Sequence, residues 1–359
     1  MDFEKIIATA EEQGASDIHF SPGLPIFFRI NGNMMSAGGE KLTAEQVSAI
    51  VSPFLTPDQA ETLKKRKQID FLARTSKGLR LRGNAFYQEF GMAASFRIIP
   101  LKIREFSTIG FPKFVHERIM SMHKGLVLIV GATGTGKSTT LASMLQERIM
   151  NKAEHCITVE DPIEYLIPSG KGVIQQREVA RDVLNFQDGI EAALREDPDV
   201  LMVGEMRNLE TISAALTMAE TGHVVFSTLH TNDCPETVTR IVDIFPADQQ
   251  DQIRSQLSAT LKMIIAQKLV PTTDGKGLVL AYEILTTNYA IQNYIRQNKI
   301  FQIPNVLQTD SSGYMVQYEQ SLAGLVIAGK ITQEIAHEYA QDKDQLKAIL
   351  VSNGVKSET

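Results

Sequence analysis

The decapeptide GATGTGKSTT at residues 131–140 constrains the fold of this chain more than any other stretch. It follows the apolar run GLVLIV and matches the pattern G-x-x-x-x-G-K-[ST] through Gly131, Gly136, Lys137 and Ser138. Spaced glycines let the backbone curl so that several N–H groups point at one phosphate, and the dipole of a following helix adds to the attraction. The stretch therefore predicts a buried strand, a phosphate-binding loop and a helix in direct succession.

The residue types of this loop suit a nucleotide that is bound together with Mg²⁺. Lys137 is expected to reach the β and γ phosphates as a point charge, and the hydroxyl of Ser138 is expected to bind Mg²⁺. A glycine-rich turn with a solvated lysine is the alternative, but the position between a strand-like and a helix-like segment favours the phosphate site. The predicted nucleotide-binding residues are Gly131, Thr133, Gly134, Thr135, Gly136, Lys137, Ser138 and Thr139.

Carboxylates flank two later apolar segments, and hydrolysis of a nucleotide needs carboxylates near the metal and the attacking water. The segment ITVEDPIEY offers Glu160, Asp161 and Glu164, and the segment REDPDVLMVGEMR offers Asp199 and Glu205. Each acid alone is more often a helix cap or a solvated charge. Because ligands bind at the carboxyl ends of parallel strands, acids at two strand ends beside a P-loop predict a catalytic site.

A further strand is framed by TGHVVFSTLHT and ends at His230. A single histidine in such a place is usually a hydrogen-bonded structural residue. Since the neighbouring strands carry the acids, a contact with the γ phosphate is also plausible for His230. Metal binding by histidine is not expected, because the seven histidines are scattered and no second His or Cys stands at ligand spacing.

The first hundred residues predict a small α+β domain. Apolar residues recur at helical spacing in residues 2–13, and helices are also expected at 43–54 and 57–67. The run PIFFRINGNMM predicts a hairpin, because Asn31 and Gly32 readily supply the positive φ angles of a tight turn. The runs IDFLAR, LRLRGNAFY and MAASFRIIP predict strands.

From residue 125 onward the pattern changes to near-continuous apolar runs that alternate with helical stretches. The runs GLVLIVG, HCITVED, DVLMVGE and HVVFSTLH lie between helical stretches at 137–150, 186–196 and 208–220. This alternation predicts a parallel sheet covered by helices on both faces, an α/β fold. Residues 247–268 are expected to form one long helix whose inward residues are Ile253, Leu257, Leu261 and Ile264.

The predicted organisation has four parts. PLKIREFSTIGFP lacks periodicity and lies between two prolines, which favours a linker. The predicted parts are an N-terminal domain at 1–100, a linker at 101–117, an ATPase core at 118–287 and a helical region with a glycine-containing break at 288–359.

Composition excludes several classes of function. The 359 residues carry a net charge of −6, which argues against a broad basic surface for nucleic acid. The two cysteines are far apart in the sequence, so neither a CxxC metal site nor a disulfide framework is expected. The opening MDFEKIIATAEEQG lacks the basic start of a secretory signal, and no window approaches 18 uncharged apolar residues. We therefore expect a cytoplasmic chain.

Taken together, these segments resemble the secretion ATPase superfamily, and most closely the type IV pilus retraction ATPases, the PilT family. The P-loop, the Asp box, the Walker B segment and the His box of that family correspond to GATGTGKST, ITVEDPIE, LREDPDVLMVGEMR and TGHVVFSTLHT. The N-terminal stretches GASDIHFSPGLPIFFRINGNM and GLRLRGNAFYQ, and QREV at 176–179, also resemble the family. The resemblance covers nearly the whole chain.

The resemblance implies a motor built as a homohexameric ring. Each subunit would have a RecA-like P-loop NTPase core and a smaller PAS-like α+β N-terminal domain, with ATP and Mg²⁺ bound between the two and completed by a neighbouring subunit. The implied activity is ATP hydrolysis that powers type IV pilus retraction and twitching motility. The implied partners are an inner-membrane pilus platform protein and, indirectly, pilin, at the cytoplasmic face of the inner membrane and without nucleic acid.

The resemblance also implies roles for single residues. Glu164 and Glu205 would share the Mg²⁺-binding and water-activating roles, with Ser138 and Glu205 as the Mg²⁺ ligands. His230 would read the γ phosphate. Three arginines of the implied catalytic site come from other segments: Arg240 near the nucleotide, and Arg80 and Arg82 from the N-terminal domain of a neighbouring subunit.

Some positions depart from the family pattern and leave alternatives open. The family segment AIRNLIRE, which is tied to retraction, is replaced by AIQNYIRQ at residues 290–297 of this chain. The family strings GEMRD and GTLHT are replaced by GEMRN and STLHT. An accessory retraction paralogue, or an ATPase of a related secretion or assembly system, is therefore an alternative function.

Three more distant alternatives are weighed against the sequence. The extension motors of the superfamily carry an extra N-terminal domain and a four-cysteine zinc site, which this chain lacks. A DNA-translocating RecA-like ATPase is disfavoured by the acidic balance. A nucleotide-binding switch without turnover is disfavoured by the two acid-bearing strand ends.

Overall fold

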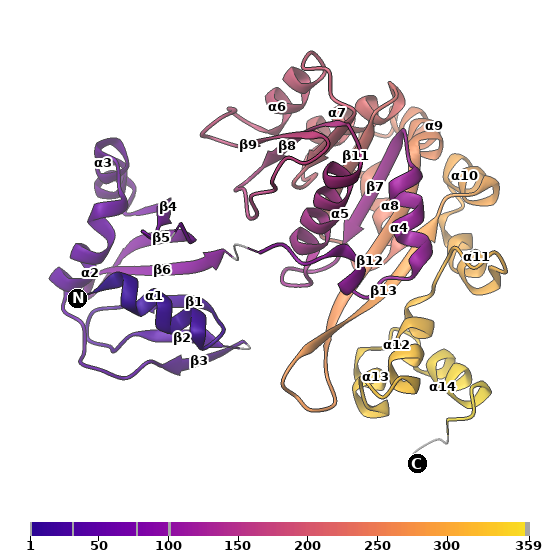
Figure 1. Ribbon diagram of the computed structural model, residues 1–359. Coiled ribbons are helices and arrows are strands. Elements are labelled where there is room, and N and C mark those ends of the chain that lie inside the picture. The colour runs from indigo at the N-terminus through magenta and orange to yellow at the C-terminus, as the bar shows by residue number, and fades with distance from the viewer. Residues whose placement is uncertain (1, 31, 77, 100–101, 356–359) are drawn as a thin grey trace. The chain divides into compact units, whose positions relative to one another are not determined.

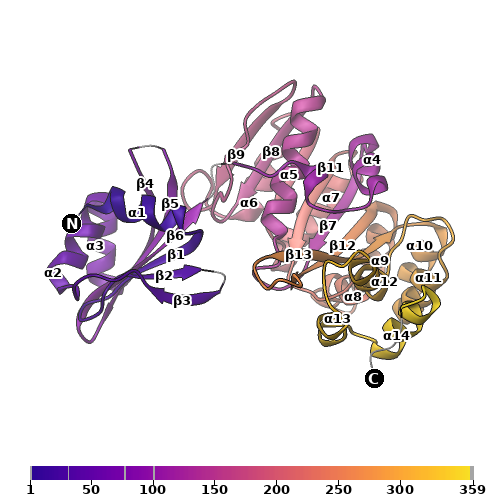
Figure 2. The same ribbon diagram turned by 60° about the horizontal axis from the view of Figure 1, so that its bottom comes forward.

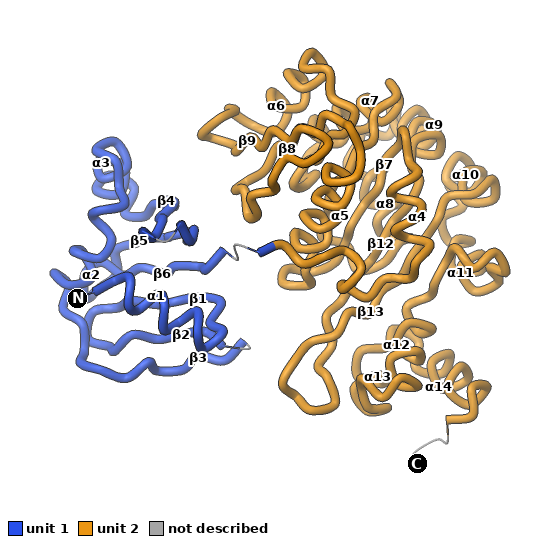
Figure 3. Tube along the Cα trace, viewed as in Figure 1, with its two compact units in different colours: residues 1–102 blue, residues 103–359 orange. Residues whose placement is uncertain are grey.

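The computed structural model describes residues 2–30, 32–76, 78–99 and 102–355 of the chain. They form two compact units, Met1–Lys102 and Ile103–Thr359, which Figure 3 shows in different colours. Each unit has hydrophobic clusters of its own, as expected of separate domains.

The first unit is an antiparallel sheet in the order β3-β2-β1-β6-β5-β4 with helices packed on one face. Buried side chains from the helices, such as Ile7, Val47 and Leu63, meet Phe71 and Phe96 of the sheet. The elements are α1 (Phe3–Glu12), β1 (Ala15–Phe20), β2 (Phe27–Ile30), β3 (Asn33–Ser36), α2 (Ala44–Val51), the 3₁₀ turn η1 (Ser52–Phe54), α3 (Pro57–Arg66), β4 (Gln68–Arg74), β5 (Arg80–Gln88) and β6 (Gly91–Ile99).

Local sequence explains where these elements begin. The hydroxyls of Thr43 and Thr56 cap α2 and α3, and the side chains of Gln46 and Gln59 complete two capping boxes. In this unit the structure has a helix or a strand at each place where the sequence predicts one, so that prediction is confirmed. In the predicted hairpin turn Gly32 has a φ of +82°, and Asn31 lies outside the described residues.

The second unit is built on a sheet in the order β13-β12-β7-β11-β10-β8-β9, parallel except for β13. Its elements are η2 (Phe106–Thr108), α4 (Lys113–Ser121), β7 (Gly125–Val130), α5 (Lys137–Asn151), β8 (His155–Glu160), β9 (Val173–Glu178), α6 (Phe186–Ala193), β10 (Val200–Val203), α7 (Leu209–Glu220), β11 (Val224–Leu229), α8 (Cys234–Asp243), α9 (Gln250–Thr260), β12 (Leu261–Pro271), β13 (Leu278–Thr286), α10 (Tyr289–Arg296), η3 (Ile300–Gln302), α11 (Ile303–Thr309), α12 (Tyr318–Ile327), α13 (Gln333–Tyr339) and α14 (Lys343–Ser352).

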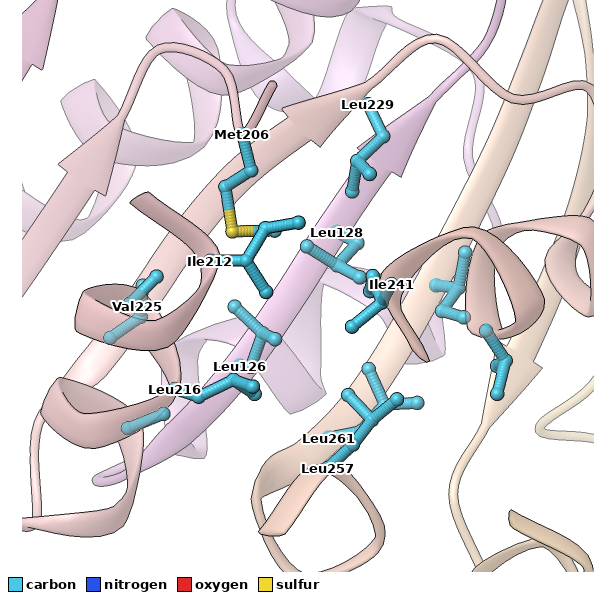
Figure 4. Packing of buried hydrophobic residues seen from close by; sticks show 14 of the residues in the cluster. Leu126, Leu128, Met206, Ile212, Leu216, Val225, Leu229, Ile241, Leu257 and Leu261 are labelled. Carbon is cyan, nitrogen blue, oxygen red and sulfur yellow. The ribbon is translucent and has the colours of Figure 1, made fainter. Parts of the chain in front are cut away.

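Helices cover both faces of this sheet, as Figures 1 and 2 show. Alternate residues of the central strand β7 face different clusters. Leu126 and Leu128 pack with residues of α6, α7, α8 and α9, several of which are drawn in Figure 4. Val127 and Ile129 pack with residues of α4 and α5. The predicted parallel sheet between two helical layers is confirmed.

The predicted linker at 101–117 differs from the structure. From Ile103 onward this segment packs on the second unit, where Ile103, Phe106 and Val115 are buried with β7 and α5. The buried Arg148 of α5 fixes the segment further, because its guanidinium donates to carbonyls at the end of α4. The missing periodicity reflects a 3₁₀ turn and a short helix that are held by tertiary contacts.

The predicted helix at 247–268 is wrong in its second half. Helix α9 ends at Thr260, and Leu261 and Ile264 lie on strand β12, which pairs with β7 and β13. Strand β12 is buried on both faces, so its apolar residues show no alternation that would distinguish it from a helix.

Beyond Asn288 the chain is helical, as predicted, with a break before α12. Helices α12, α13 and α14 bury Tyr318, Leu322 and Leu346 against Val270 and Ala281 of the β12–β13 hairpin. The C-terminal region is therefore joined to the second unit by a hydrophobic cluster. Among the described residues, no helix combines the length and apolarity that a membrane span requires.

Candidate active site

The loop after β7 has the backbone that a phosphate cradle requires. Gly131, Gly134 and Gly136 have φ angles of +147°, +85° and +87°, which favour glycine. A Cβ at Gly131 would lie 2.5 Å from the carbonyl oxygen of Gln267 and 2.7 Å from Oγ1 of Thr135. Only glycine fits at Gly131, because the loop curls tightly against strand β12.

Helix α5 begins directly after this loop, with Gly136 as its N-cap and Lys137 as its first residue. The unpaired N–H groups of the first turn therefore lie beside the cradle, where an anion gains most from them. The half-buried side chains of Ser138 and Thr139 also lie in this turn, and the Thr139 hydroxyl is 2.8 Å from the hydroxyl of Tyr165.

Lys137 contacts the loop and interacts electrostatically with Glu205 and Glu164, the two acids to which the family resemblance assigns a role. Its Nζ donates to the carbonyl oxygens of Gly131, at 2.7 Å, and Ala132, at 2.9 Å. Burial lowers the pKa of Lys137, and the charges of Glu205 and Glu164 oppose this shift. The acids of two strand ends thus act electrostatically on the P-loop lysine.

Glu205 follows β10, and its side chain is only 12% exposed. Together with Lys137, Arg207 and His230 it forms the group of charges at the site. Its Oε1 lies 2.6 Å from a guanidinium nitrogen of Arg207, and its Oε2 lies 3.6 Å from Nε2 of His230. The end of β10 is also fixed to β11, because the Thr228 hydroxyl donates to the carbonyl of Gly204. The carboxylate of Glu205 therefore has a guanidinium and an imidazole as neighbours.

His230 follows β11 and joins the same group of charges. Burial lowers the pKa of its imidazole, the charges of Lys137 and Arg207 add to the effect, and Glu205 opposes it. Because the lowered pKa favours the neutral ring, His230 offers one N–H donor and one acceptor near neutral pH.

Of the three acids at and after the end of β8, one is buried and two are exposed. Glu160 is 8% exposed, and its Oε1 accepts from the Thr158 hydroxyl at 2.6 Å and from the Gln176 amide at 3.0 Å. Burial raises the pKa of Glu160 to about 7. Asp161 and Glu164 are exposed, so their carboxylates are accessible to a ligand or to water.

Other predicted residues lie outside this group of charges. Asp199 accepts the N–H of His155 at the amino ends of β8 and β10, at the opposite end of the sheet. Arg240 is exposed in the last turn of α8, and within the described residues no hydrogen bond or ion pair joins it to the site. On β5, Arg80 is only 3% exposed, whereas Arg82 is exposed.

Sequence reasoning missed residues that support the site from a distance. Gln267 of β12 donates to the carbonyl of Thr135 at 2.6 Å and accepts from the hydroxyl of Thr140 at 3.1 Å, and it is 1% exposed. A polar residue inside the apolar run IIAQKLV was the available signal. Arg207, which contacts Glu205, carried no such signal because exposed arginines are common.

The site fits Mg²⁺ held by few protein ligands. Among the described residues, no group of three or more His, Cys, Asp or Glu side chains could hold a metal ion. Mg²⁺ is usually bound by one or two protein groups together with phosphate oxygens and water. The glycine cradle, the Ser138 hydroxyl and the nearby carboxylate of Glu205 match that arrangement.

Known proteins are similar to this chain over most of its length. The sequence matches the family described as Type II/IV secretion system protein over residues 1–345. It is 42% identical over 341 residues to the type IV pilus retraction ATPase PilT of Pseudomonas aeruginosa, covering 95% of this chain and 98% of that protein. It is 42% identical over 318 residues to a twitching motility protein of Neisseria gonorrhoeae, and the match covers 89% of this chain and 85% of that protein. The crystal structure of the pilus retraction motor PilT with bound ADP has a TM-score of 0.89 at 43% identity, covering 97% of this chain and 99% of that one.

Proposed function

Because the chain belongs to the Type II/IV secretion system protein family, we propose that it hydrolyses ATP to power type IV pilus retraction. Its resemblance to the PilT family and its RecA-like α/β fold are confirmed by the similar proteins. One observation carries the proposal: Lys137, Glu205 and His230 converge on a glycine-built P-loop at the carboxyl edge of the sheet. A phosphate cradle with its lysine and a carboxylate that can orient water are parts that P-loop NTPases use for phosphoryl transfer to water.

In this mechanism the N–H groups of the P-loop and the ammonium of Lys137 bind the β and γ phosphates. The Ser138 hydroxyl and Glu205 would hold Mg²⁺, which neutralises charge on the phosphates when it is bound. Glu205 orients the attacking water, and a guanidinium nitrogen of Arg207 lies 2.6 Å from its carboxylate. The exposed Glu164 contributes negative charge at the rim and orients water or the metal. His230, in its neutral form, donates a hydrogen bond to the γ phosphate.

The proposed assembly is a homohexamer in which a neighbouring subunit completes each site. An arginine supplied by another chain stabilises charge on the transferred phosphoryl group and is worth about 10³–10⁵ in turnover in other systems. The exposed Arg82 suits this role, because its side chain is accessible to a second subunit. Arg80 is buried within its own subunit and would position the strand, and Arg240 would act near the nucleotide of its own subunit.

The proposed location is the cytoplasmic face of the inner membrane, where the ring would bind the pilus platform protein and act indirectly on pilin. The net charge of −6 is consistent with protein partners and not with nucleic acid. A filter-binding assay with single- and double-stranded DNA that showed tight binding would favour the DNA-translocating alternative.

The proposal is tested by two variants of the full chain. Lys137→Ala should lose nucleotide binding and Glu205→Gln should lose turnover by about 10²–10⁴ while nucleotide still binds. Cells that carry either variant in place of the wild type should fail to retract pili. Wild-type ATP hydrolysis by the Lys137→Ala protein would refute the P-loop assignment.

The shared site is tested by mixing two inactive proteins. Arg82→Ala and Glu205→Gln should each be nearly inactive alone, but subunit exchange should create some sites with intact Arg82 and Glu205 from different chains. Part of the ATPase activity should therefore return. If verified exchange restores no activity, Arg82 does not act on a neighbouring site.

An accessory retraction paralogue or a related secretion ATPase is the second candidate, and the segment AIQNYIRQ on α10 favours it. The two candidates differ in cells: deletion of a main motor abolishes retraction, whereas deletion of an accessory ATPase weakens it. Measuring pilus retraction in a deletion strain, with the wild-type chain restored as control, separates them.

A further inference from the structure

The second unit has a pocket of about 240 Å³ at the amino ends of β7 and β12, at the opposite end of these strands from the P-loop. It is lined by the end of α4 and the residues after it, by Lys262 at the start of β12, and by Thr287 after β13. The nucleotide site does not use any of these residues.

The pocket carries positive charge without counter-ions. Arg118, Lys124 and Lys262 line it, and the lining contains no carboxylate. In the parts of the chain that the structure describes, none of these three side chains forms an ion pair. The whole chain has a net charge of −6, so this local excess of cations runs against the overall balance.

Two donor atoms of residues that line the pocket have no hydrogen-bond partner among the described residues. They are Nε of Arg118 and the hydroxyl of Thr287, and both atoms are shielded from water. The guanidinium of Arg118 is held 4.4 Å from the ring centre of Tyr314. Because both atoms lie behind the wall of the pocket, the attraction for an anion comes from the charges of Arg118, Lys124 and Lys262.

Lys262 gives further support for an anion in the pocket. Its side chain is half-buried, and burial followed by the charge of Lys124 lowers its pKa. An anion in the pocket would relieve both effects, because it replaces lost hydration and screens the two ammonium groups from each other.

We propose that this pocket binds a phosphate group and forms a second anion site, separate from the P-loop. The pocket has room for one phosphate with its water, since a water molecule takes about 30 Å³ of liquid volume. Arg118 would supply the charged fork, and Lys124 and Lys262 would supply point charges. Inorganic phosphate, a phosphate monoester and the headgroup of an anionic lipid share this chemistry. The site does not depend on ATP hydrolysis.

Acetylation of Lys262 in the full chain tests the proposal, because only a neutral amine reacts. The P-loop is kept filled with ADP and Mg²⁺, and acetylation is read by peptide mass spectrometry in inorganic phosphate and in chloride of equal ionic strength. A unit negative charge about 4 Å away shifts the neutral fraction about fivefold even at the dielectric constant of water. The acetylation rate of Lys262 should therefore fall about fivefold in phosphate, while that of the exposed Lys276 and Lys330 stays unchanged.

Variants and vesicles complete the test. Lys124→Gln removes one exposed charge and should weaken the protection of Lys262, whereas the matched control Lys276→Gln should not. Protection by vesicles of phosphatidylglycerol, but not by free phosphate, would identify a lipid headgroup as the source. Protection by free phosphate alone would identify a soluble ligand. Equal acetylation of Lys262 in chloride, in phosphate and with phosphatidylglycerol vesicles would overturn the proposal.

Discussion

Gln267 offers a sharp test of how the fold supports the P-loop. It stands next to Ala266, which pairs with Val130 at the end of β7, and it is 1% exposed. Its amide donates to the carbonyl of Thr135 at 2.6 Å and accepts from the hydroxyl of Thr140 at 3.1 Å. One side chain therefore ties the loop and the first turn of α5 to strand β12.

Gln267→Met keeps the length of the side chain and removes both hydrogen bonds. Thr135 and Thr140 are 9% and 1% exposed, so water does not readily replace the lost partner. A buried group left unpaired costs about 1–3 kcal/mol, which gives a loss of about 2–6 kcal/mol in the free energy of unfolding. Without these bonds the loop of the variant is less ordered before nucleotide binds, and part of the binding free energy is used to order it. We therefore expect ADP affinity to fall at least about fivefold, the equivalent of about 1 kcal/mol.

The assay compares ADP affinity with the free energy of unfolding measured in urea. Thr260→Val is the matched control, because its buried hydroxyl donates to the carbonyl of Gln256 far from the loop. The control should lose stability and keep ADP affinity. Thr140→Val combined with Gln267→Met should cost less than the sum of the two, because the residues share one bond. Wild-type ADP affinity in Gln267→Met would refute the reasoning.

Three further predictions concern the acids and the C-terminal helices. Glu164→Gln should reduce turnover less than Glu205→Gln in a phosphate-release assay, because Glu164 is exposed and Glu205 is oriented by Arg207; the reverse order would exchange their roles. Burial raises the pKa of Glu160 from its ordinary 4.5 to about 7. Between these two pH values the folded chain holds a proton that the unfolded chain has lost. The free energy of unfolding should therefore fall by about 3 kcal/mol as pH rises from 4.5 to 7. Urea unfolding at pH 5 and 8 should show this loss in the wild type and not in Glu160→Gln. An equal change of the unfolding free energy with pH in the two proteins would contradict the prediction. Arg296→Ala should keep ATPase activity and impair pilus retraction, and unchanged twitching would remove α10 from the mechanism.

The sequence predicted those parts of the site whose chemistry is local. Three glycines, a lysine and a serine at fixed spacing are enough for the P-loop, because each acts through its own backbone or side chain. Acids at strand ends were found because parallel strands finish at one edge. The support from Gln267 could not be found in this way, since it depends on β12 lying beside β7, more than 120 residues apart in sequence.

The errors have a common physical cause. Leu261 and Ile264 continue the helical spacing of α9, but they belong to a strand buried on both faces, and periodicity cannot distinguish the two. The predicted linker has no amphipathic pattern, yet Arg148 and a cluster of buried apolar side chains hold it on the second unit. In both cases distant partners decided the structure.

The packing of helix α10 gives a physical reason to expect that fuel use and mechanical work can be separated in this chain. Ile291 and Ile295 are fully buried in the cluster that also contains Ile241 of α8, the helix that follows the His230 loop. The opposite face of α10 carries the exposed Asn293 and Arg296. Helix α10 packs on α9, which in turn contacts α8, so we expect a shift of α8 with the state of the nucleotide to be passed to α10 through α9, because a close-packed core has little free volume. A change on the exposed face leaves that packing intact, so it can alter what the helix pushes against without altering the catalytic residues.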